Sequence, residues 1–346
     1  MKHNLLGTTD IKVSEVCLGT MTWGSQNNQE EGFEQMDYAI ENGVNFFDTA
    51  ELYPVPPKAD TKHRTETIIG NWFEKTGKRS DVILASKVKG GGISHIRDGS
   101  LLSPSDIDIA LEGSLTRLKT DYIDLYQLHW PNRPTYNFAN HGFSSQGLDA
   151  NKITDQHLAI LECLNGHVKS GKIRHFGVSD DTAWGVMTYL NLAKQHNLPR
   201  LMSIQNEYSL LCRWFDKDLK EIAELEKCGL LAWSPLATGV ISGKYLDGNM
   251  PEKSRRAYSG GGKTFRDTPQ TQRAVVAYIN LAKEYDLDVC QMAIAFTLSR
   301  SFVTASIIGA TTMPQLKNNI AAADVTLSKE VLDKIDQIWR DNAYSF

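Results

Sequence analysis

Eight short apolar segments recur along the chain, and longer amphipathic segments separate them. This alternation constrains the fold more than any other feature of the sequence. The apolar segments are Val16–Leu18, Val44–Phe47, Val82–Ala85, Tyr122–Leu128, Ile173–Val178, Leu201–Ile204, Leu230–Trp233 and Ser306–Ile308. Strands that alternate with helices form parallel sheets through helical crossovers. Eight such units favour an α/β fold of the closed (β/α)8 TIM-barrel type, although an open, doubly wound sheet would show the same pattern.

Helix signals lie in the segments between the apolar runs. Predicted helices span Asp106–Leu118, Thr182–His196, Gln270–Tyr285 and Pro314–Ala323. The first of them follows Ser103–Pro104, which is a typical helix start. Ahead of the first barrel strand, His3–Leu6 and Lys12–Ser14 predict a β-hairpin, and Ser328–Arg340 predicts an extra helix after the eighth unit. No linker interrupts the pattern, so residues 1–346 are expected to form a single domain.

The composition excludes several classes of protein. The 346 residues are 41% hydrophobic and carry a net charge of −4, which supplies one large core but too little positive charge for a nucleic-acid surface. The sequence lacks a run of about eighteen apolar residues, the length of a membrane span, and Met1–Gly7 does not have the apolar stretch of a signal peptide. We therefore expect a soluble, cytoplasmic protein that acts on a small molecule and binds neither nucleic acid nor membrane.

The cysteines and histidines do not predict a metal site. The five cysteines are odd in number, widely spaced and without a Cys-x-x-Cys pair, so neither a disulfide framework nor a zinc site is indicated. His157, Cys163 and His167 share one predicted helical segment and could imitate metal ligands. Placement in the core or at the surface is the simpler interpretation, and we expect reduced thiols and no metal.

Polar side chains follow three successive strands at the point where each strand ends. Asp48 follows the second strand and Tyr53 lies in the next loop, Lys87 ends the third, and His129 ends the fourth. Because the carboxyl ends of barrel strands carry the chemistry of this fold, these side chains should converge on one region. Each residue alone has a structural explanation: a buried His129, a solvated Lys87, or an Asp48 that caps a helix.

Together these residues suit the protonation of an oxygen atom. A tyrosine hydroxyl has a pKa of about 10 and holds its proton at neutral pH. A neighbouring ammonium such as Lys87 lowers that pKa, Asp48 could hold Lys87 in place, and His129 could orient a carbonyl oxygen. No side chain donates hydride, so a nicotinamide or flavin must supply it. A different chemistry, in which Lys87 forms a Schiff base in an aldolase-like barrel, remains open.

The ordered motifs of this chain resemble those of the aldo-keto reductases along essentially its whole length. The matching stretches are Gly19–Gly24, Asn45–Tyr53, Ala85–Lys87, Tyr122–Trp130, Gly171–Ser179 and Ile308–Thr311. Within that family the chain is most similar to the bacterial Tas-like proteins, through Tyr53–Pro57 and His129–Pro131. A more distant similarity, in Ala232–Leu236, is to the potassium-channel β subunits.

The resemblance implies an NADPH-dependent oxidoreductase that reduces aldehydes or ketones to alcohols. It implies Asp48, Tyr53, Lys87 and His129 as the catalytic residues, with Tyr53 as the general acid. The channel-subunit relatives leave a second function open, in which the protein interacts with a partner, its bound NADPH reports the redox state, and catalysis is slow.

The resemblance also implies where NADPH lies. Ser179, Asp180 and Gln205 would hold the nicotinamide carboxamide, and Trp233 would stack on the nicotinamide ring. The full set of implied cofactor-binding residues is Gly19, Thr20, Met21, Asp48, Ser179, Asp180, Gln205, Trp233, Ser234, Pro235, Leu236, Thr238, Gly239, Lys244, Arg255, Gly309, Thr311, Gln315, Asn318 and Asn319. The predicted substrate contacts are Trp23, Tyr53, His129 and Trp130, together with the long loops Pro54–His63 and Pro131–Ile153.

Two features of the sequence bear on the cofactor. The segment Ile241–Gln270 carries six basic residues, Lys244, Lys253, Arg255, Arg256, Lys263 and Arg266, against three acidic ones. It can bind phosphates, or it can be a solvated charge run. At position 180 the family usually has asparagine, whereas this chain has Asp180. An ionised carboxylate accepts hydrogen bonds but cannot donate one, so Asp180 could donate to the carboxamide oxygen only when protonated.

Overall fold

Eight parallel strands close into a barrel in the computed structural model, which describes residues 1–262 and 264–343. The barrel strands are β3 (Val16–Gly19), β4 (Phe46–Asp48), β5 (Ile83–Val88), β6 (Ile123–Leu128), β7 (Ile173–Ser179), β8 (Ile204–Gln205), β9 (Leu230–Trp233) and β10 (Val303–Ile308). Each strand pairs with the next, and β10 pairs with β3 to complete the ring. The predicted (β/α)8 barrel is therefore confirmed, and the open doubly wound sheet is excluded because this sheet has no edge.

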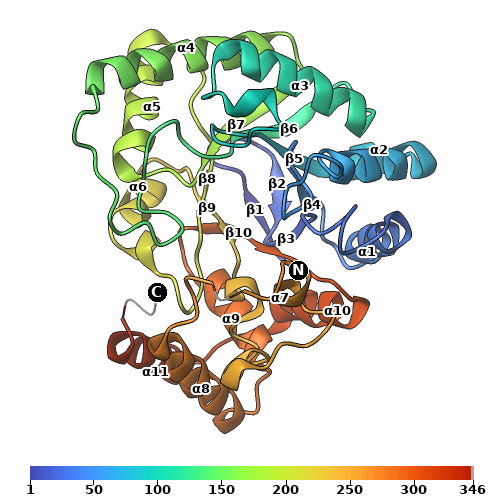
Figure 1. The fold of residues 1–346 in the computed structure, drawn as a ribbon, viewed down its shortest axis with the longest axis vertical. Coiled ribbons are helices and arrows are strands. Elements are labelled where there is room, and N and C mark those ends of the chain that lie inside the picture. Colours follow the sequence, from blue (N-terminus) through green and yellow to red (C-terminus); the bar gives the residue numbers. More distant parts are fainter. Residues whose placement is uncertain (263, 344–346) are drawn as a thin grey trace.

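Helices surround the barrel and follow one another around it in chain order from α1 to α6, with α8 to α11 completing the wall (Figure 1). Their bounds are α1 (Gln29–Glu41), α2 (Arg64–Thr76), α3 (Pro104–Leu118), α4 (Ala150–Lys169), α5 (Ala183–His196), α6 (Leu219–Leu225), α7 (Arg255–Tyr258), α8 (Pro269–Glu284), α9 (Val289–Leu298), α10 (Met313–Ala321) and α11 (Lys329–Asp341). Every helix predicted from the sequence is present, with ends that shift by at most two residues.

The helix starts follow from local hydrogen bonds. Ser103 accepts a hydrogen bond from the backbone N–H of Asp106, whose side chain bonds back to Ser103, and Pro104 occupies the first turn of α3. Such a capping box satisfies backbone donors that the first turn of a helix would otherwise leave unpaired. At the starts of α10 and α11, the side chains of Thr312 and Ser328 each accept a hydrogen bond from a backbone N–H of the first turn.

The amino-terminal hairpin closes one end of the barrel. Strands β1 (His3–Leu5) and β2 (Lys12–Ser14) pair antiparallel, as predicted, and the Asn4 side chain donates to the Thr304 carbonyl of β10. Leu6 and Val13 pack with Phe46 and Leu125 in a core cluster inside the barrel. Since this end is filled with apolar side chains, only the carboxyl ends of the strands are left to hold a cleft.

The long connections all leave the carboxyl ends of the strands. Residues 54–63 and 131–149 have no helix or strand, whereas the third connection, residues 238–269, contains α7 and short 3-10 turns. Within the described part of the chain, no helix is both long and apolar enough to cross a membrane.

Candidate active site

A large cleft of about 950 Å³ opens at the carboxyl ends of the strands. Every residue that the family resemblance implies for cofactor binding lines it: Gly19, Thr20, Met21, Asp48, Ser179, Asp180, Gln205, Trp233, Ser234, Pro235, Leu236, Thr238, Gly239, Lys244, Arg255, Gly309, Thr311, Gln315, Asn318 and Asn319. Tyr53 and His129 line the same cleft. Residues spread over most of the sequence therefore meet on one surface.

Lys87 lies directly beneath the cleft, where it joins Asp48 to Tyr53. Its Nζ atom lies 2.5 Å from Asp48 Oδ2, 2.8 Å from the Thr49 carbonyl oxygen and 3.3 Å from the Tyr53 hydroxyl. Parallel registers explain this convergence, because Asp48 on β4 pairs with Ala85 on β5, two residues before Lys87. The structure thus brings three of the four predicted catalytic residues into direct contact.

The hydrogen bonds fix the direction in which protons can move. Lys87 is fully buried, and each of its three N–H donors has an acceptor. Because Lys87 donates to the Tyr53 oxygen, the Tyr53 proton is left to donate toward the cleft. The same burial argues against the Schiff-base chemistry, since the amine has neither a free lone pair nor access to a carbonyl.

Burial and charge set the protonation states. Burial acts to lower the pKa of Lys87, but Asp48, together with Tyr53, outweighs it, and the net pKa is raised. Burial raises the pKa of Tyr53, and the opposing charge of Lys87 offsets only part of this effect. Lys87 therefore lowers the Tyr53 pKa as expected, but burial, whose depth the sequence did not show, has the larger effect and raises the net pKa.

His129 completes the group as a neutral imidazole. Its ring lies edge-on to Tyr53, with 5.7 Å between the ring centroids. Burial, followed by the charge of Lys87, holds the pKa of His129 well below its usual value. Nδ1 of His129 is buried and has no hydrogen-bond partner in the described structure.

Sequence reasoning missed Gln127, which holds the other oxygen of Asp48. The Gln127 amide donates to Asp48 Oδ1 at 3.2 Å, and the Gln205 amide donates to the same atom at 2.8 Å. Gln205 also donates to the Gln127 side-chain oxygen, so the amide nitrogen of Gln205 is already engaged. Only the side-chain oxygen of Gln205 is then left to bind the cofactor. The available signal was position, since Gln127 is the polar residue beside Lys87 in the register of β5 and β6.

The residues expected at the nicotinamide end lie together at the ends of β7 and β9. The Trp233 indole N–H donates to Asp180 Oδ1 at 3.1 Å, and Asp180 has a left-handed backbone with a φ of 50°. Burial raises the pKa of Asp180 well above its usual value, the Trp233 bond opposes that rise, and Glu207 adds to it. Burial therefore shifts Asp180 toward its protonated form, which can donate a hydrogen bond as asparagine does.

A phenylalanine that sequence reasoning did not single out covers the Trp233 ring. Phe138, in the loop 131–149, stacks on Trp233 with 5.6 Å between ring centroids and 27° between ring planes. Phe138 itself is 56% exposed and lines the cleft. Any other ring that stacks on the same face of Trp233 would have to displace Phe138.

Some cations of the basic loop form ion pairs, and others face the cleft without an ion pair among the described residues. Arg266 pairs with Glu207 at 2.5 Å, and Arg256 pairs with Asp267 at 2.6 Å. Lys244 and Arg255 line the cleft and have no ion pair within the described residues. Lys263 lies outside the described residues.

Lys244 and Arg255 lie toward different ends of the cleft, as the groups that each charge affects indicate. The charge of Arg255 acts on the pKa of Tyr53, whereas the charge of Lys244 acts on that of Cys290, which lies on α9. The adjacent residue Gln291 donates to Asn318 at 2.8 Å, at the end expected for adenosine. Arg255 therefore lies toward the catalytic end and Lys244 toward the adenosine end.

The residues expected to bind adenosine organise the start of α10. The Gln315 side chain accepts from the Thr311 backbone N–H at 3.0 Å, and Asn319 donates to the Gly309 carbonyl at 3.1 Å. A helix amino terminus attracts negative charge, which suits a phosphate at this end of the cleft.

The predicted substrate wall needs one correction. Trp23 does not line the cleft: it is fully buried in the core between the barrel and the helices, and its indole N–H donates to Gln35 at 3.2 Å. The turn after β3 directs Trp23 inward, with its backbone N–H bonded to the Thr20 carbonyl. Trp130 does line the cleft, and so does Val55 of the predicted loop 54–63. Leu52 and Ile93, which were not predicted as substrate contacts, line it as well.

Comparison with known proteins places the whole chain among related sequences. Residues 15–340 match the Aldo/keto reductase family. The chain is 43% identical to "Protein tas" of Escherichia coli, over 99% of each chain, and 34% identical to "Uncharacterized oxidoreductase YrpG" of Bacillus subtilis, over 98% of this chain and 96% of that one. It is also 36% identical to "Aldo-keto reductase" of Babesia bovis, over 76% of this chain and 98% of that one.

Proposed function

Because this chain belongs to the aldo/keto reductase family, we propose that it is an NADPH-dependent oxidoreductase that reduces aldehydes or ketones to alcohols, with Tyr53 as the general acid. Family membership itself makes the protein an oxidoreductase of the aldo/keto reductase type. The proposal adds the cofactor, the direction of the reaction and the role of each side chain. It also treats residues 1–346 as a single catalytic domain.

The cleft fits an extended dinucleotide. The fit rests on its volume of about 950 Å³ and on the two cations, Lys244 and Arg255, that face it without an ion pair in the described structure. Ser179, Asp180, Gln205 and Trp233 would hold the nicotinamide, and residues 234–239 would line the pyrophosphate path. When bound, NADPH supplies the hydride for the carbonyl carbon.

The proton step follows from the geometry of Tyr53. Its hydroxyl proton faces the cleft, where it can pass to the carbonyl oxygen as negative charge develops there. Lys87 then stabilises the phenolate, and Asp48, held by Gln127 and Gln205, keeps Lys87 in place. Neutral His129 can share a hydrogen bond with the same carbonyl oxygen and so orient the substrate.

One observation carries the proposal: the buried chain of contacts from Asp48 through Lys87 to Tyr53 ends at the floor of the cleft. Replacement of Tyr53 by phenylalanine removes the hydroxyl proton that this series of contacts presents to the cleft. We expect Tyr53→Phe to lose roughly 10²- to 10⁴-fold in turnover, the range for a general acid. NADPH affinity should stay near that of the wild type.

The measurement is turnover of an aldehyde panel with excess NADPH, alongside NADPH binding by fluorescence. Tyr38→Phe is the matched control, because Tyr38 lies on α1 outside the cleft. If Tyr53→Phe retained normal turnover, Tyr53 would not be the acid. A wild-type protein that oxidised one equivalent of bound NADPH and then stopped would instead favour the redox-sensing function.

A further inference from the structure

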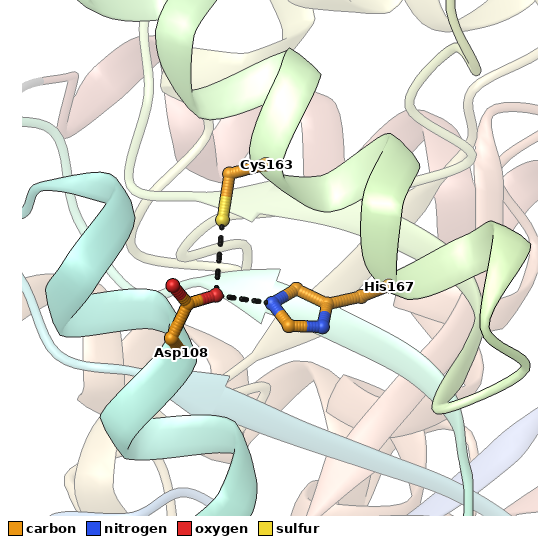
Figure 2. A group of neighbouring side chains, drawn as sticks. All are labelled: Asp108, Cys163 and His167. Carbon is orange, nitrogen blue, oxygen red and sulfur yellow. Dashed lines mark hydrogen bonds and ion pairs between the residues drawn. The ribbon is translucent and has the colours of Figure 1, made fainter.

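Outside the cleft, three side chains with metal-binding chemistry meet between two helices. Asp108 lies on α3, and Cys163 and His167 lie on α4. Cys163 Sγ lies 3.5 Å from Asp108 Oδ1, and His167 Nε2 lies 2.7 Å from the same oxygen. Figure 2 shows all three side chains pointing into the space between the helices. We propose that Asp108, Cys163 and His167 bind a zinc ion.

The backbone holds the three groups in position before any metal arrives. Cys163 and His167 are four residues apart in α4, so they share one face of the helix. Asp108 faces them from α3, which packs against α4. Two rigid helices therefore supply the ligands, and ordering the site needs little change in the backbone.

The distances leave room for a tetrahedral ion. All three ligand atoms lie within 4.8 Å of one another. Zinc, with metal–ligand distances of about 2.0–2.3 Å, separates its ligand atoms by roughly 3.3–3.7 Å. The sulfur–oxygen separation of 3.5 Å already falls in that range, and the nitrogen–oxygen separation of 2.7 Å must open by about 0.6 Å.

Exposure allows that small adjustment and an entry path. The Asp108 side chain is 60% exposed, whereas the His167 side chain is 13% exposed. Rotation of the exposed carboxylate separates its oxygen from His167 while the helices stay still. Water from the solvent side can fill the fourth position, because three protein ligands leave one position of a tetrahedral zinc open.

The donor set selects among metals. A thiolate and an imidazole favour zinc over magnesium or calcium, which prefer oxygen ligands. Zinc binds the thiolate, so coordination releases the thiol proton of Cys163 to solvent. None of the three residues lines the cleft, so the ion would join α3 to α4 rather than take part in carbonyl reduction.

The competing explanation is that the three side chains only form hydrogen bonds with one another and bind no metal. Cys163 and His167 both contact Asp108 without any metal, and the sequence analysis expected none. The two explanations differ in a measurable way. A metal site binds one zinc ion per chain through the thiol, whereas a hydrogen-bonded trio does not.

The test is titration of the untagged, metal-free protein with zinc in competition with a chromophoric chelator. Wild type should bind one equivalent, and cobalt in place of zinc should give a thiolate-to-metal absorption band. Cys163→Ser and His167→Gln should weaken zinc at least about tenfold, and Cys163→Ser should lose the cobalt band. Asp108→Asn should also weaken binding.

Matched controls separate loss of the site from loss of the fold. Cys290→Ser removes another partly buried thiol, and His196→Gln removes an exposed histidine near the end of α5, so both should bind zinc like wild type. At the same zinc concentration, the thermal midpoint should rise more in wild type and both controls than in Cys163→Ser. Equal zinc binding in wild type and Cys163→Ser, or no stoichiometric binding in wild type, would overturn the proposal. Each result is independent of reductase activity.

Discussion

At the scale of single residues, the buried pair formed by Lys87 and Asp48 links stability to chemistry. Both side chains are almost fully buried, and their charged atoms lie 2.5 Å apart. Removal of one partner from a buried ion pair leaves an uncompensated charge and typically costs about 3–5 kcal/mol. A neutral replacement of both partners avoids that penalty.

We therefore expect Lys87→Met to lower the free energy of unfolding by about 3–5 kcal/mol. The double variant Asp48→Asn, Lys87→Met should recover much of this loss, because no charge stays unpaired. Denaturant titration of the wild type, both single variants and the double variant gives the comparison. Turnover should stay low in the double variant, since nothing stabilises the Tyr53 phenolate; recovery of both stability and turnover would contradict the role given to Lys87.

Asp180 gives a prediction about pH. Its raised pKa favours the protonated acid, which can donate to a carboxamide oxygen. As the pH rises through this pKa, the acid ionises and loses its donor, so NADPH affinity should fall. One hydrogen bond contributes about 0.5–1.5 kcal/mol, which corresponds to roughly a two- to twelvefold loss.

The matched variant for this experiment is Asp180→Asn, which donates at every pH. NADPH titrations of both proteins across a pH series give a ratio of affinities. Ionisation of the cofactor's own phosphate cancels in that ratio. We expect a ratio near one at low pH that grows in favour of Asn as the pH rises. A ratio that does not change with pH would mean that the Asp180 proton takes no part in cofactor binding.

The sequence predicts residues at strand ends well and side-chain environments less well. Asp48, Tyr53, Lys87 and His129 were predicted to lie together because strand ends converge in a barrel, and in the structure they do lie together. Trp23 was misplaced although it too follows a strand, because the direction of a turn depends on contacts distant in sequence. Trp23 packs against Gly32 of α1, where a Cβ atom would lie 3.3 Å from the Trp23 ring.

At the scale of elements, the loop 131–149 is the part of the cleft that the fold constrains least. The loop has no helix or strand, yet it places Phe138 on the Trp233 ring. The sequence identified this loop from its length, but could not show which residue reaches the cofactor side. An aromatic pair contributes about 0.5–1.5 kcal/mol beyond its buried area, so displacement of Phe138 opposes nicotinamide binding by a comparable amount.

We expect Phe138→Ala to tighten NADPH binding by roughly two- to twelvefold, which is that energy expressed as an affinity ratio. Stopped-flow fluorescence should show faster association, because the Trp233 face is already open. Phe143→Ala is the control, since Phe143 is in the same loop but does not line the cleft. Weaker NADPH binding by Phe138→Ala would show that Phe138 closes over the cofactor instead of competing with it.

At the scale of the whole molecule, the barrel divides the chain into a filled end and an open end. The hairpin fills one end with apolar side chains, and every predicted cofactor residue meets at the other. Alternating apolar and amphipathic segments predict this architecture because each unit repeats the same local pattern. Strand lengths were harder to predict: Leu201–Ile204 looks like the other segments, yet β8 contains only Ile204 and Gln205. The length of a strand depends on its hydrogen-bonded neighbours in the sheet, and these neighbours are distant in sequence.

The cleft extends across the barrel mouth, so Lys244 and Arg255, which have no ion pair among the described residues, should serve different parts of one cofactor. Arg255 lies toward Tyr53 and Lys244 toward the adenosine end. We expect Lys244→Met to weaken NADPH by roughly ten- to a hundredfold, as for a lost bond to a charged group, and to leave NADH almost unchanged. Arg255→Met should weaken both cofactors alike, because both carry the pyrophosphate. Fluorescence titration of each variant with NADPH and NADH separates these patterns, with Arg273→Met, exposed on α8 outside the cleft, as the control. The reason for this pattern is that we assign Lys244 to the 2′-phosphate at the adenosine end, a group that NADPH has and NADH lacks. If Lys244→Met weakened NADH as much as NADPH, Lys244 would not bind the 2′-phosphate, and the preference for NADPH would have to arise elsewhere along the cleft.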